Sequence, residues 1–297
     1  MSEVLQTREL RKEYKDTVAL KKLSFTVESG QIFGLLGPNG SGKTTTLGIL
    51  LGVIQPNSGM FSWFGNGQKD ENRKNIGALL ETPNFYPYLN ATDNLKVVAK
   101  IKGVKDEKSA IESALKKVQL WERRNSKFKT YSLGMKQRLA IGATMLSDPD
   151  VLVLDEPTNG LDPQGIAEMR DLILDIAKEG KTIIIASHLL DEIEKLCTHV
   201  AILKYGELLQ VGTLEEIMTH DRLLLVKADD MNKLKSKMDE WSPISFVKEE
   251  GGEFMIAVEE QYSPADVNKM FAENGVYLSG IKEYKRNLES TFLEIVK

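Results

Sequence analysis

The sequence has little cysteine and no excess of basic residues. Cys197 is the single cysteine among 297 residues, and 39 Lys and Arg stand against 43 Asp and Glu, which gives a net charge of −4. One cysteine can form neither an intramolecular disulfide nor a thiolate metal cage, so we expect a reducing compartment. Broad nucleic-acid binding usually needs a basic excess, so we expect no nucleic-acid partner.

Long apolar runs are missing as well. The longest, at about 47–54, is far below the roughly 18 residues that cross a bilayer. Residues 1–10 alternate polar and apolar side chains and lack the apolar core of a signal peptide. The sequence shows no internal repeat and no low-complexity tract. We therefore expect a globular chain that does not span a membrane, although it could dock on a protein that does.

The length suits two domains, or one large domain with an appendage. Hydrophobic residues make up 41% of the chain and charged residues 28%, which is typical of a protein with a sizeable core. The pattern breaks near residues 213–222. We therefore predict one domain at 1–220 and a second at 221–297.

The first domain is predicted to be α/β. Short alternating or apolar segments predict strands at 3–7, 23–28, 31–36 and 60–64, and another apolar run lies at 75–80. Residues 84–146 show a 3.6-residue periodicity, which predicts a helical subdomain with helices at 93–101, 107–120 and 135–146. Apolar strands at 151–154, 182–186 and 200–203 then alternate with a helix between Asp162 and Gly180 and another at 189–196. This alternation indicates a mostly parallel sheet.

The second domain is predicted to be a small α+β unit. Its segments read strand, helix, strand, strand, helix, strand, at 223–227, 231–241, 244–248, 253–258, 264–274 and 276–281, and a last helix follows at 288–296. Ser263 and Asp266 are placed to cap the second helix, with Pro264 at its first position. The order βαββαβ favours a ferredoxin-like, split βαβ unit.

A glycine-rich turn lies between a predicted strand and a predicted helix. It matches the pattern G-x-x-x-x-G-K-[ST] through Gly37, Pro38, Asn39, Gly40, Ser41, Gly42, Lys43 and Thr44, with Thr45 next in the helix. Such a turn points consecutive N–H groups inward and places a helix start beside them, which favours phosphate. Lys43 would reach the β- and γ-phosphates of ATP, and Thr44 would bind Mg²⁺. The alternative is a glycine turn with a solvated lysine.

Two carboxylates follow a buried strand. Asp155 and Glu156 come directly after residues 151–154, at the strand end where open α/β sheets bind ligands. Asp155 would hold Mg²⁺, and Glu156 would act as general base toward the attacking water. The alternative is a solvated acidic pair at a strand end.

Residues 3–215 resemble the ATP-binding subunits of ABC transporters, because these motifs occur in that family's order. The resemblance implies a P-loop ATPase core with an antiparallel β subdomain and a helical subdomain. It also implies that Tyr14 stacks on adenine. Tyr131-Ser132-Leu133-Gly134-Met135 lies at the signature position, where Ser132 and Gly134 would bind the γ-phosphate held by an opposite subunit. A surface tyrosine and a plain helix cap are the alternatives for Tyr14 and Ser132.

The resemblance assigns two more residues. Asn159-Gly160-Leu161-Asp162 resembles the loop that crosses the dimer seam, although it could be only a turn with Asp162 as cap. His188, directly after a strand, resembles the switch histidine that contacts the γ-phosphate. A lone histidine is otherwise more often structural.

Two positions depart from the family pattern. Glu81 stands where the family usually has glutamine and is expected to contribute a metal- and water-binding oxygen. Leu133 and Met135 replace Gly and Gln of the usual signature. Both departures resemble the exporters of bacitracin and lantibiotic-type peptides. Glu81 either alters coupling to the membrane partner or is neutral drift.

The resemblance implies a cytoplasmic ATPase on the inner face of the membrane. Its partners would be ATP, a second copy or homologous ATPase subunit, and a polytopic permease that exports a peptide, antibiotic or other amphipathic compound. Aromatic residues at 82–95 would meet that permease, or would pack locally. The rival is a related ATPase acting in translation or DNA repair, but such relatives usually carry two fused cassettes or a long coiled coil.

Overall fold

The computed structural model describes residues 2–67, 70–80, 83–218, 222–238, 240, 243–259, 261–284 and 287–296. The chain forms two compact units. The first comprises Met1–Ile217 together with Phe292–Lys297, and the second comprises Met218–Thr291. Each unit contains its own cluster of buried hydrophobic side chains.

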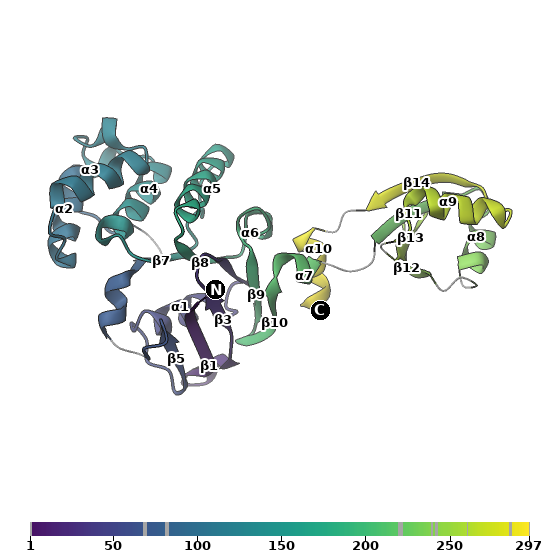
Figure 1. Ribbon diagram of the computed structural model, residues 1–297, viewed down its shortest axis with the longest axis horizontal. Helices are drawn as coiled ribbons and strands as arrows, with labels where there is room; N and C mark the ends of the chain where they lie inside the picture. Colours follow the sequence, from purple (N-terminus) through teal and green to yellow (C-terminus); the bar gives the residue numbers. More distant parts are fainter. Residues whose placement is uncertain are drawn as a thin grey trace. The chain divides into compact units, whose positions relative to one another are not determined.

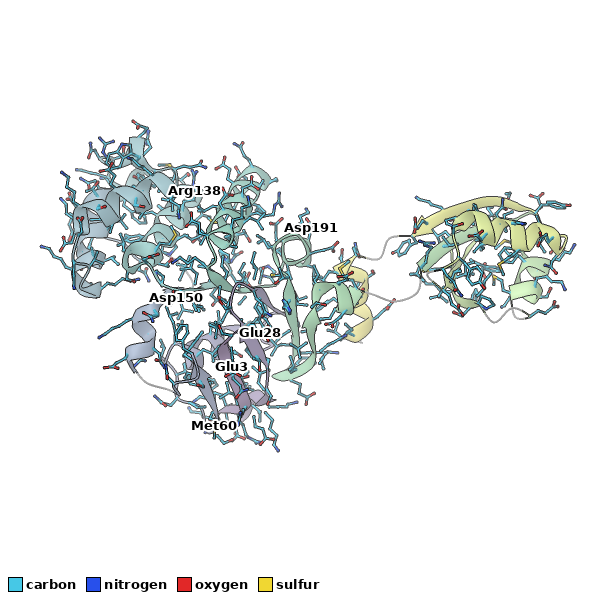
Figure 2. All side chains as sticks on the ribbon, in the orientation of Figure 1. Glu3, Glu28, Met60, Arg138, Asp150 and Asp191 are labelled. Carbon is cyan, nitrogen blue, oxygen red and sulfur yellow. The ribbon has the colours of Figure 1, made fainter. Side chains whose placement is uncertain are left out.

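An antiparallel sheet begins the first unit. It consists of β1 (Glu3–Tyr14), β2 (Thr17–Leu23), β3 (Thr26–Glu28) and β5 (Ser58–Trp63). Strand β1 pairs with the other three, and Figure 2 labels Glu3 and Glu28, which face each other across β1 and β3. The predicted strand at 3–7 was too short, β2 was not predicted, and the strand predicted at 23–28 covers β3 and only the last residue of β2. Irregular pairing at 8–13 breaks the two-residue alternation, which hides the second half of β1 from a pattern search.

A second, six-stranded sheet carries the centre of this unit. Its order is β10-β9-β4-β8-β7-β6, parallel from β9 to β6 and antiparallel between β10 and β9. The bounds are β4 (Ile32–Leu36), β6 (Ile76–Leu79), β7 (Val151–Asp155), β8 (Thr182–Ser187), β9 (His199–Lys204) and β10 (Glu207–Thr213). Every residue of β4, β7 and β8 is buried, as expected for central parallel strands. The predicted α/β class and mostly parallel sheet are confirmed.

Seven α-helices of the described chain precede the second unit's first strand. They are α1 (Lys43–Leu50), α2 (Ala91–Lys102), α3 (Glu107–Lys117), α4 (Leu133–Thr144), α5 (Pro163–Lys178), α6 (Leu190–Leu196) and α7 (Leu214–Met218). Short 3-10 turns lie at Asp70–Asn75, Trp121–Arg123, Phe128–Thr130 and Met145–Ser147. Figure 1 shows α2, α3 and α4 gathered together, apart from β1 and β5, so the helical subdomain is present.

Caps move two helix starts earlier than the apolar periodicity predicts. Asn90 accepts a hydrogen bond from the Asp93 N–H at 2.8 Å, so α2 begins at Ala91 rather than at Asp93. Ser132 caps α4 in the same way, and that helix begins at Leu133 rather than at Met135. Thr92 and Asp93 in the first turn of α2 carry no apolar stripe, and in α4 the cap at Ser132 marks a start that the periodicity did not locate.

Neither β10 nor α7 was predicted. Along β10 the exposed residues include Leu209 and Val211, and this apolar face is unlike the usual polar outer face of an edge strand. Helix α7 has only five residues, too few to show a periodicity.

The second unit has the strand and helix order βαββαβ. Its elements are β11 (Arg222–Ala228), α8 (Met231–Met238), β12 (Ile244–Glu250), β13 (Glu253–Val258), α9 (Pro264–Glu273) and β14 (Leu278–Tyr284). The sheet order is β12-β13-β11-β14 with all neighbours antiparallel, which is the arrangement of a split βαβ unit. Ser263 and Asp266 form a reciprocal capping box at α9. Helix α10 (Leu288–Ile295) follows.

No helix within the described residues is both long and apolar enough to cross a membrane.

Cys197 lies directly after α6 and is buried. Burial raises the pKa of its thiol well above the ordinary value. Because Cys197 is the single cysteine of the chain, no intramolecular disulfide can form.

Candidate nucleotide-binding site

The glycine-rich turn connects the buried strand β4 to helix α1. Gly40 and Gly42 adopt φ values of 79° and 105°, and Gly42 directly precedes the helix. This left-handed backbone lets the chain reverse within a few residues and point its N–H groups to one side. The structure therefore places the turn at a helix start, as the motif predicts.

Neighbouring backbone leaves no space for side chains at two of these glycines. A Cβ atom at Gly42 would lie 2.6 Å from Cδ2 of Leu20 and 2.8 Å from the carbonyl oxygen of Ala19. A Cβ atom at Gly37 would lie 2.5 Å from Oγ of Ser41 and would collide with the Leu203 carbonyl. Strands β2 and β9 thus hold the turn from behind.

Lys43 is the first residue of α1, and its side chain is only 6% exposed. Its Nζ donates to the Gly37 carbonyl oxygen at 2.7 Å and lies 3.8 Å from Oε1 of Glu156. Burial lowers the pKa of the Lys43 ammonium, while the nearby carboxylates of Glu156 and Asp155 oppose that shift. The ammonium is therefore held over the turn in a partly desolvated position, where it binds an anion more strongly than in water.

Glu156 stands at the carboxyl end of β7 with an unusual backbone. Its φ is +47°, which is uncommon for a residue other than glycine and marks local strain. Its N–H donates to the Ala186 carbonyl of the adjacent strand at 2.9 Å. That pairing places its Oε2 at 2.9 Å from Nδ1 of His188 and 3.4 Å from Oγ of Ser187. The parallel sheet thus brings together two residues 32 positions apart.

An open cavity of about 690 Å³ lies over this assembly. Its described lining includes residues 39–45 together with Glu156, Tyr14 and Tyr205, whereas Gly37, Pro38, Asp155 and His188 are not among the described lining residues. Tyr14 ends β1 and is 44% exposed, with the Lys12 ammonium 4.9 Å from its ring centroid. Asp155, at the end of β7, is 2% exposed. The cavity combines N–H donors, an ammonium, hydroxyls, carboxylates and an aromatic ring.

Comparison with known proteins decides the family. Residues 20–159 match the ABC transporter family. The bacitracin transport ATP-binding protein BcrA of Bacillus licheniformis is 38% identical over 301 residues, covering 100% of this chain and 98% of that protein. This chain belongs to the ATP-binding proteins of ABC transporters. The predicted family resemblance is confirmed.

Two further proteins are similar to this ABC transporter ATP-binding protein, one in sequence and one in structure. The lantibiotic transport ATP-binding protein SrtF of Streptococcus pyogenes is 38% identical over 206 residues, which covers 69% of this chain and 89% of that protein. The structure of cbiO1 from Clostridium perfringens, part of the ABC transporter complex cbiONQ, has a TM-score of 0.67 at 28% identity and covers 73% of this chain and 91% of that one. The protein is a nucleotide-binding, ATP-hydrolysing transporter subunit. The rival role in translation or DNA repair is not favoured.

The signature segment of this ABC transporter ATP-binding protein lies at the start of α4. Ser132 is exposed and accepts a hydrogen bond from the Met135 N–H at 3.3 Å, so the predicted alternative of a helix cap is realised. The same oxygen remains able to accept or donate further bonds. None of the described residues that line the cavity belongs to 131–135. The structure therefore does not bring Ser132 and Gly134 into the cavity of their own chain.

The loop 159–162 lies against the signature segment within one chain. A Cβ atom at Gly160 would be 3.1 Å from Cδ2 of Leu133. Asp162 caps α5 by accepting a bond from the Gly165 N–H at 2.8 Å. Farther along α4, Arg138, labelled in Figure 2, forms an ion pair with Glu168 of α5 at 3.5 Å. Helices α4 and α5 thus hold the two loops together.

The remaining predicted residues fall in two groups. Glu81 lies outside the described residues. Of the aromatic segment after it, Phe85 packs against Phe128 with ring centroids 5.2 Å apart, while Tyr86 and Tyr88 are 49% and 64% exposed. Local packing and an exposed aromatic surface are both present.

Sequence reasoning missed Ser187 and several residues of the cavity lining, among them Tyr205. Ser187 touches Glu156, and its place directly before His188 was the available signal. Tyr205 lines the cavity, and its only signal was a tyrosine-glycine turn after a predicted strand. Its approach to the glycine-rich turn depends on tertiary pairing that no local pattern records.

Proposed function

We propose that this protein powers the export of a peptide, antibiotic or other amphipathic compound through a separately encoded permease. The observation that carries this proposal is the 38% identity to a bacitracin transport protein over the whole chain, including residues 221–297. The shorter match to a lantibiotic transport protein supports the same class of cargo. We also propose that residues 1–220 are the ATPase domain and that residues 221–297 are an accessory domain.

The proposed ligand is ATP with Mg²⁺. The N–H groups of 37–44 and the Lys43 ammonium would hold the phosphates, and Tyr14 would stack on the base. The Thr44 hydroxyl and the Asp155 carboxylate would hold the cation, with Glu81 as a further oxygen donor. No group of three or more His, Cys, Asp or Glu side chains suited to a metal occurs among the described residues, which fits a cation held largely by phosphate and water oxygens. When bound, Mg²⁺ would neutralise charge on the phosphates.

Glu156 is the proposed general base, and His188 the proposed switch residue. Oε2 of Glu156 lies 2.9 Å from His188, and its Oε1 lies 3.8 Å from the Lys43 ammonium, so the carboxylate is held between two nitrogen groups at the cavity wall. From that position Glu156 would accept a proton from the attacking water. His188 would orient that carboxylate and contact the terminal phosphate. Lys43 would stabilise the developing charge.

The complete site is proposed to need two subunits. Ser132 and Gly134 are presented at the start of α4, and Asp162 lies in the adjoining loop, while the described lining of the cavity comes from other segments. A second copy, or a homologous ATPase, would bring these three residues to the nucleotide of the first chain. The helix start and the Ser132 hydroxyl suit a phosphate oxygen. ATP would then close the pair, and hydrolysis would open it.

The membrane partner is proposed to be a polytopic permease, with this subunit on the inner face of the membrane. The exposed rings of Tyr86 and Tyr88 lie just before α2. Exposed aromatic side chains suit the core of a protein interface. This surface is the proposed docking site.

A single substitution tests the proposed base. Glu156→Gln should lower steady-state phosphate release by about 100-fold or more while MgATP binding, followed by calorimetry, persists. Because hydrolysis no longer opens the pair, this variant should accumulate as an ATP-bound dimer in light scattering. Asp175→Asn, which removes an exposed carboxylate from α5, is the matched control and should keep wild-type turnover. Equal turnover in Glu156→Gln and wild type would contradict the assignment of the base.

A further inference from the structure

The turn between β9 and β10 carries an aromatic side chain at a position that favours other residues. Lys204 and Glu207 pair across the hairpin, so Tyr205 and Gly206 form a two-residue connection with φ values of 50° and 77°. Such turns prefer Asn, Asp or Gly at both central positions because both need φ above zero. The backbone therefore does not explain the tyrosine.

Backbone contacts fix this turn against the glycine-rich turn. The Gly206 N–H donates to the Ser41 carbonyl at 3.1 Å, and the Gly206 carbonyl accepts from the Lys21 N–H at 2.7 Å. A Cβ atom at Gly206 would lie 2.5 Å from the Ala19 carbonyl oxygen. The residue next to Tyr205 is thus bonded to both β2 and the phosphate-binding turn. Tyr205 has a defined place relative to both.

The Tyr205 ring is exposed and lines the cavity that Tyr14 also lines. It is 70% exposed, so packing within the chain does not explain it. The Lys204 ammonium lies 5.5 Å from the ring centroid and also donates to the Val296 carbonyl at the end of α10. A cation at that distance is attracted to the ring. The ring that lines the cavity thus lies beside a lysine that is itself hydrogen-bonded to Val296.

We propose that Tyr205 is a second nucleoside-contacting residue, which lies against the base or ribose of the nucleotide together with Tyr14. The proposal rests on the nucleotide site described above. Two aromatic side chains that line one cavity offer a nucleoside more contact than the single ring implied by the family resemblance. Since a ring contact recognises the flat face of a base, it adds affinity for the nucleoside and none for the phosphates.

The test separates the nucleoside from the phosphates. Calorimetry measures the binding of MgATP and of magnesium tripolyphosphate, which has no nucleoside, to the full chain. The main variant is Tyr205→Asn, because asparagine suits the turn and keeps the hairpin folded. Tyr205→Phe keeps the ring, Tyr277→Ala removes an exposed tyrosine of the second unit, and Gly206→Ala disturbs the support of the glycine-rich turn.

Tyr205→Asn should weaken MgATP binding about fivefold to tenfold and leave tripolyphosphate binding unchanged. Tyr205→Phe and Tyr277→Ala should match the wild type, and Gly206→Ala should weaken both ligands. Unchanged MgATP binding in Tyr205→Asn would overturn the proposal, as would an equal loss for both ligands, which indicates only structural support. If the wild type binds neither ligand, the nucleotide site itself is wrong.

Discussion

The two segments that we propose to bind phosphate are built in opposite ways. The glycine-rich turn is enclosed: Lys43 is 6% exposed, and β2 and β9 leave no space for a Cβ atom at Gly42 or Gly37. The signature segment faces outward: Ser132 is exposed, and Leu133 is 43% exposed. Both segments nevertheless include the start of a helix, at Lys43 and at Leu133.

This difference teaches which half of the proposed site a single chain completes by itself. The enclosed turn holds its N–H groups and its lysine in place before any ligand arrives, so little ordering is left for binding. The exposed signature segment is fixed by α4, and most of the second half of that helix is buried. None of the residues 131–135, however, is among the described residues that line the cavity of the same chain. One segment should therefore determine nucleotide affinity and the other should determine association.

The largest expected effect is on the affinity of the isolated chain for MgATP, which Lys43 should determine and Ser132 should not. Lys43→Ala should weaken MgATP binding to the isolated chain by about 100-fold, because charge-assisted hydrogen bonds to phosphate are worth on the order of 3 kcal/mol. Ser132→Ala should leave that affinity within about twofold, since its hydroxyl is proposed to contact the nucleotide of another subunit. Calorimetry at protein concentrations below those that give a dimer checks both variants.

Ser132→Ala should instead affect the association of two subunits. In a Glu156→Gln background, Ser132→Ala should abolish the ATP-dependent dimer seen by light scattering. If Ser132→Ala instead weakens nucleotide binding by the isolated chain, the signature acts within one chain and the comparison fails.

Glycine substitutions give the next effect, on stability. Gly42 has φ of 105°, and a Cβ atom added there would lie 2.6 Å from Cδ2 of Leu20, so Gly42→Ala should cost about 1–3 kcal/mol of unfolding free energy. Gly134 lies in the first turn of α4, where an added Cβ atom would meet only Cδ2 of Leu161 at 3.8 Å. Gly134→Ala should therefore raise stability by about 0.5 kcal/mol. Urea denaturation measures both changes.

The outcome that contradicts this contrast is a similar loss of stability at both glycines. The signature would then be as tightly enclosed as the turn behind Lys43.

The sequence predicted the enclosed half of the site well, because its chemistry is local. The strand, the glycine-rich turn and the helix that follows are contiguous in the sequence. Asp155 and Glu156 likewise lie directly at the end of a contiguous apolar strand. The contact between Glu156 and His188 was not predicted; it arises because strands β7 and β8 are neighbours in the parallel sheet. Patterns with a fixed period or a fixed order are readable without tertiary information.

The parts that the sequence did not predict depend on pairing between distant segments. Tyr205 reaches the cavity only because Gly206 bonds to Ser41, which lies far away in the chain. The second half of β1 was missed because irregular pairing interrupts its alternation. The approach of Leu133, at the start of α4, to Gly160, in the loop before α5, likewise cannot be predicted from either segment alone.

The smallest expected effect tests whether Ser132 does more than cap α4. Ser132→Ala removes an N-cap and should cost about 1 kcal/mol of unfolding free energy, as should Asp162→Ala at the cap of α5. Ser132→Asp keeps a capping oxygen, so its stability in urea should remain near wild type, within about 0.5 kcal/mol. Its carboxylate would nevertheless repel a phosphate brought by another subunit, so ATP turnover should fall at least as far as in Ser132→Ala. A stable Ser132→Asp protein with wild-type turnover would reduce Ser132 to a helix cap and remove the outward-facing half of the comparison.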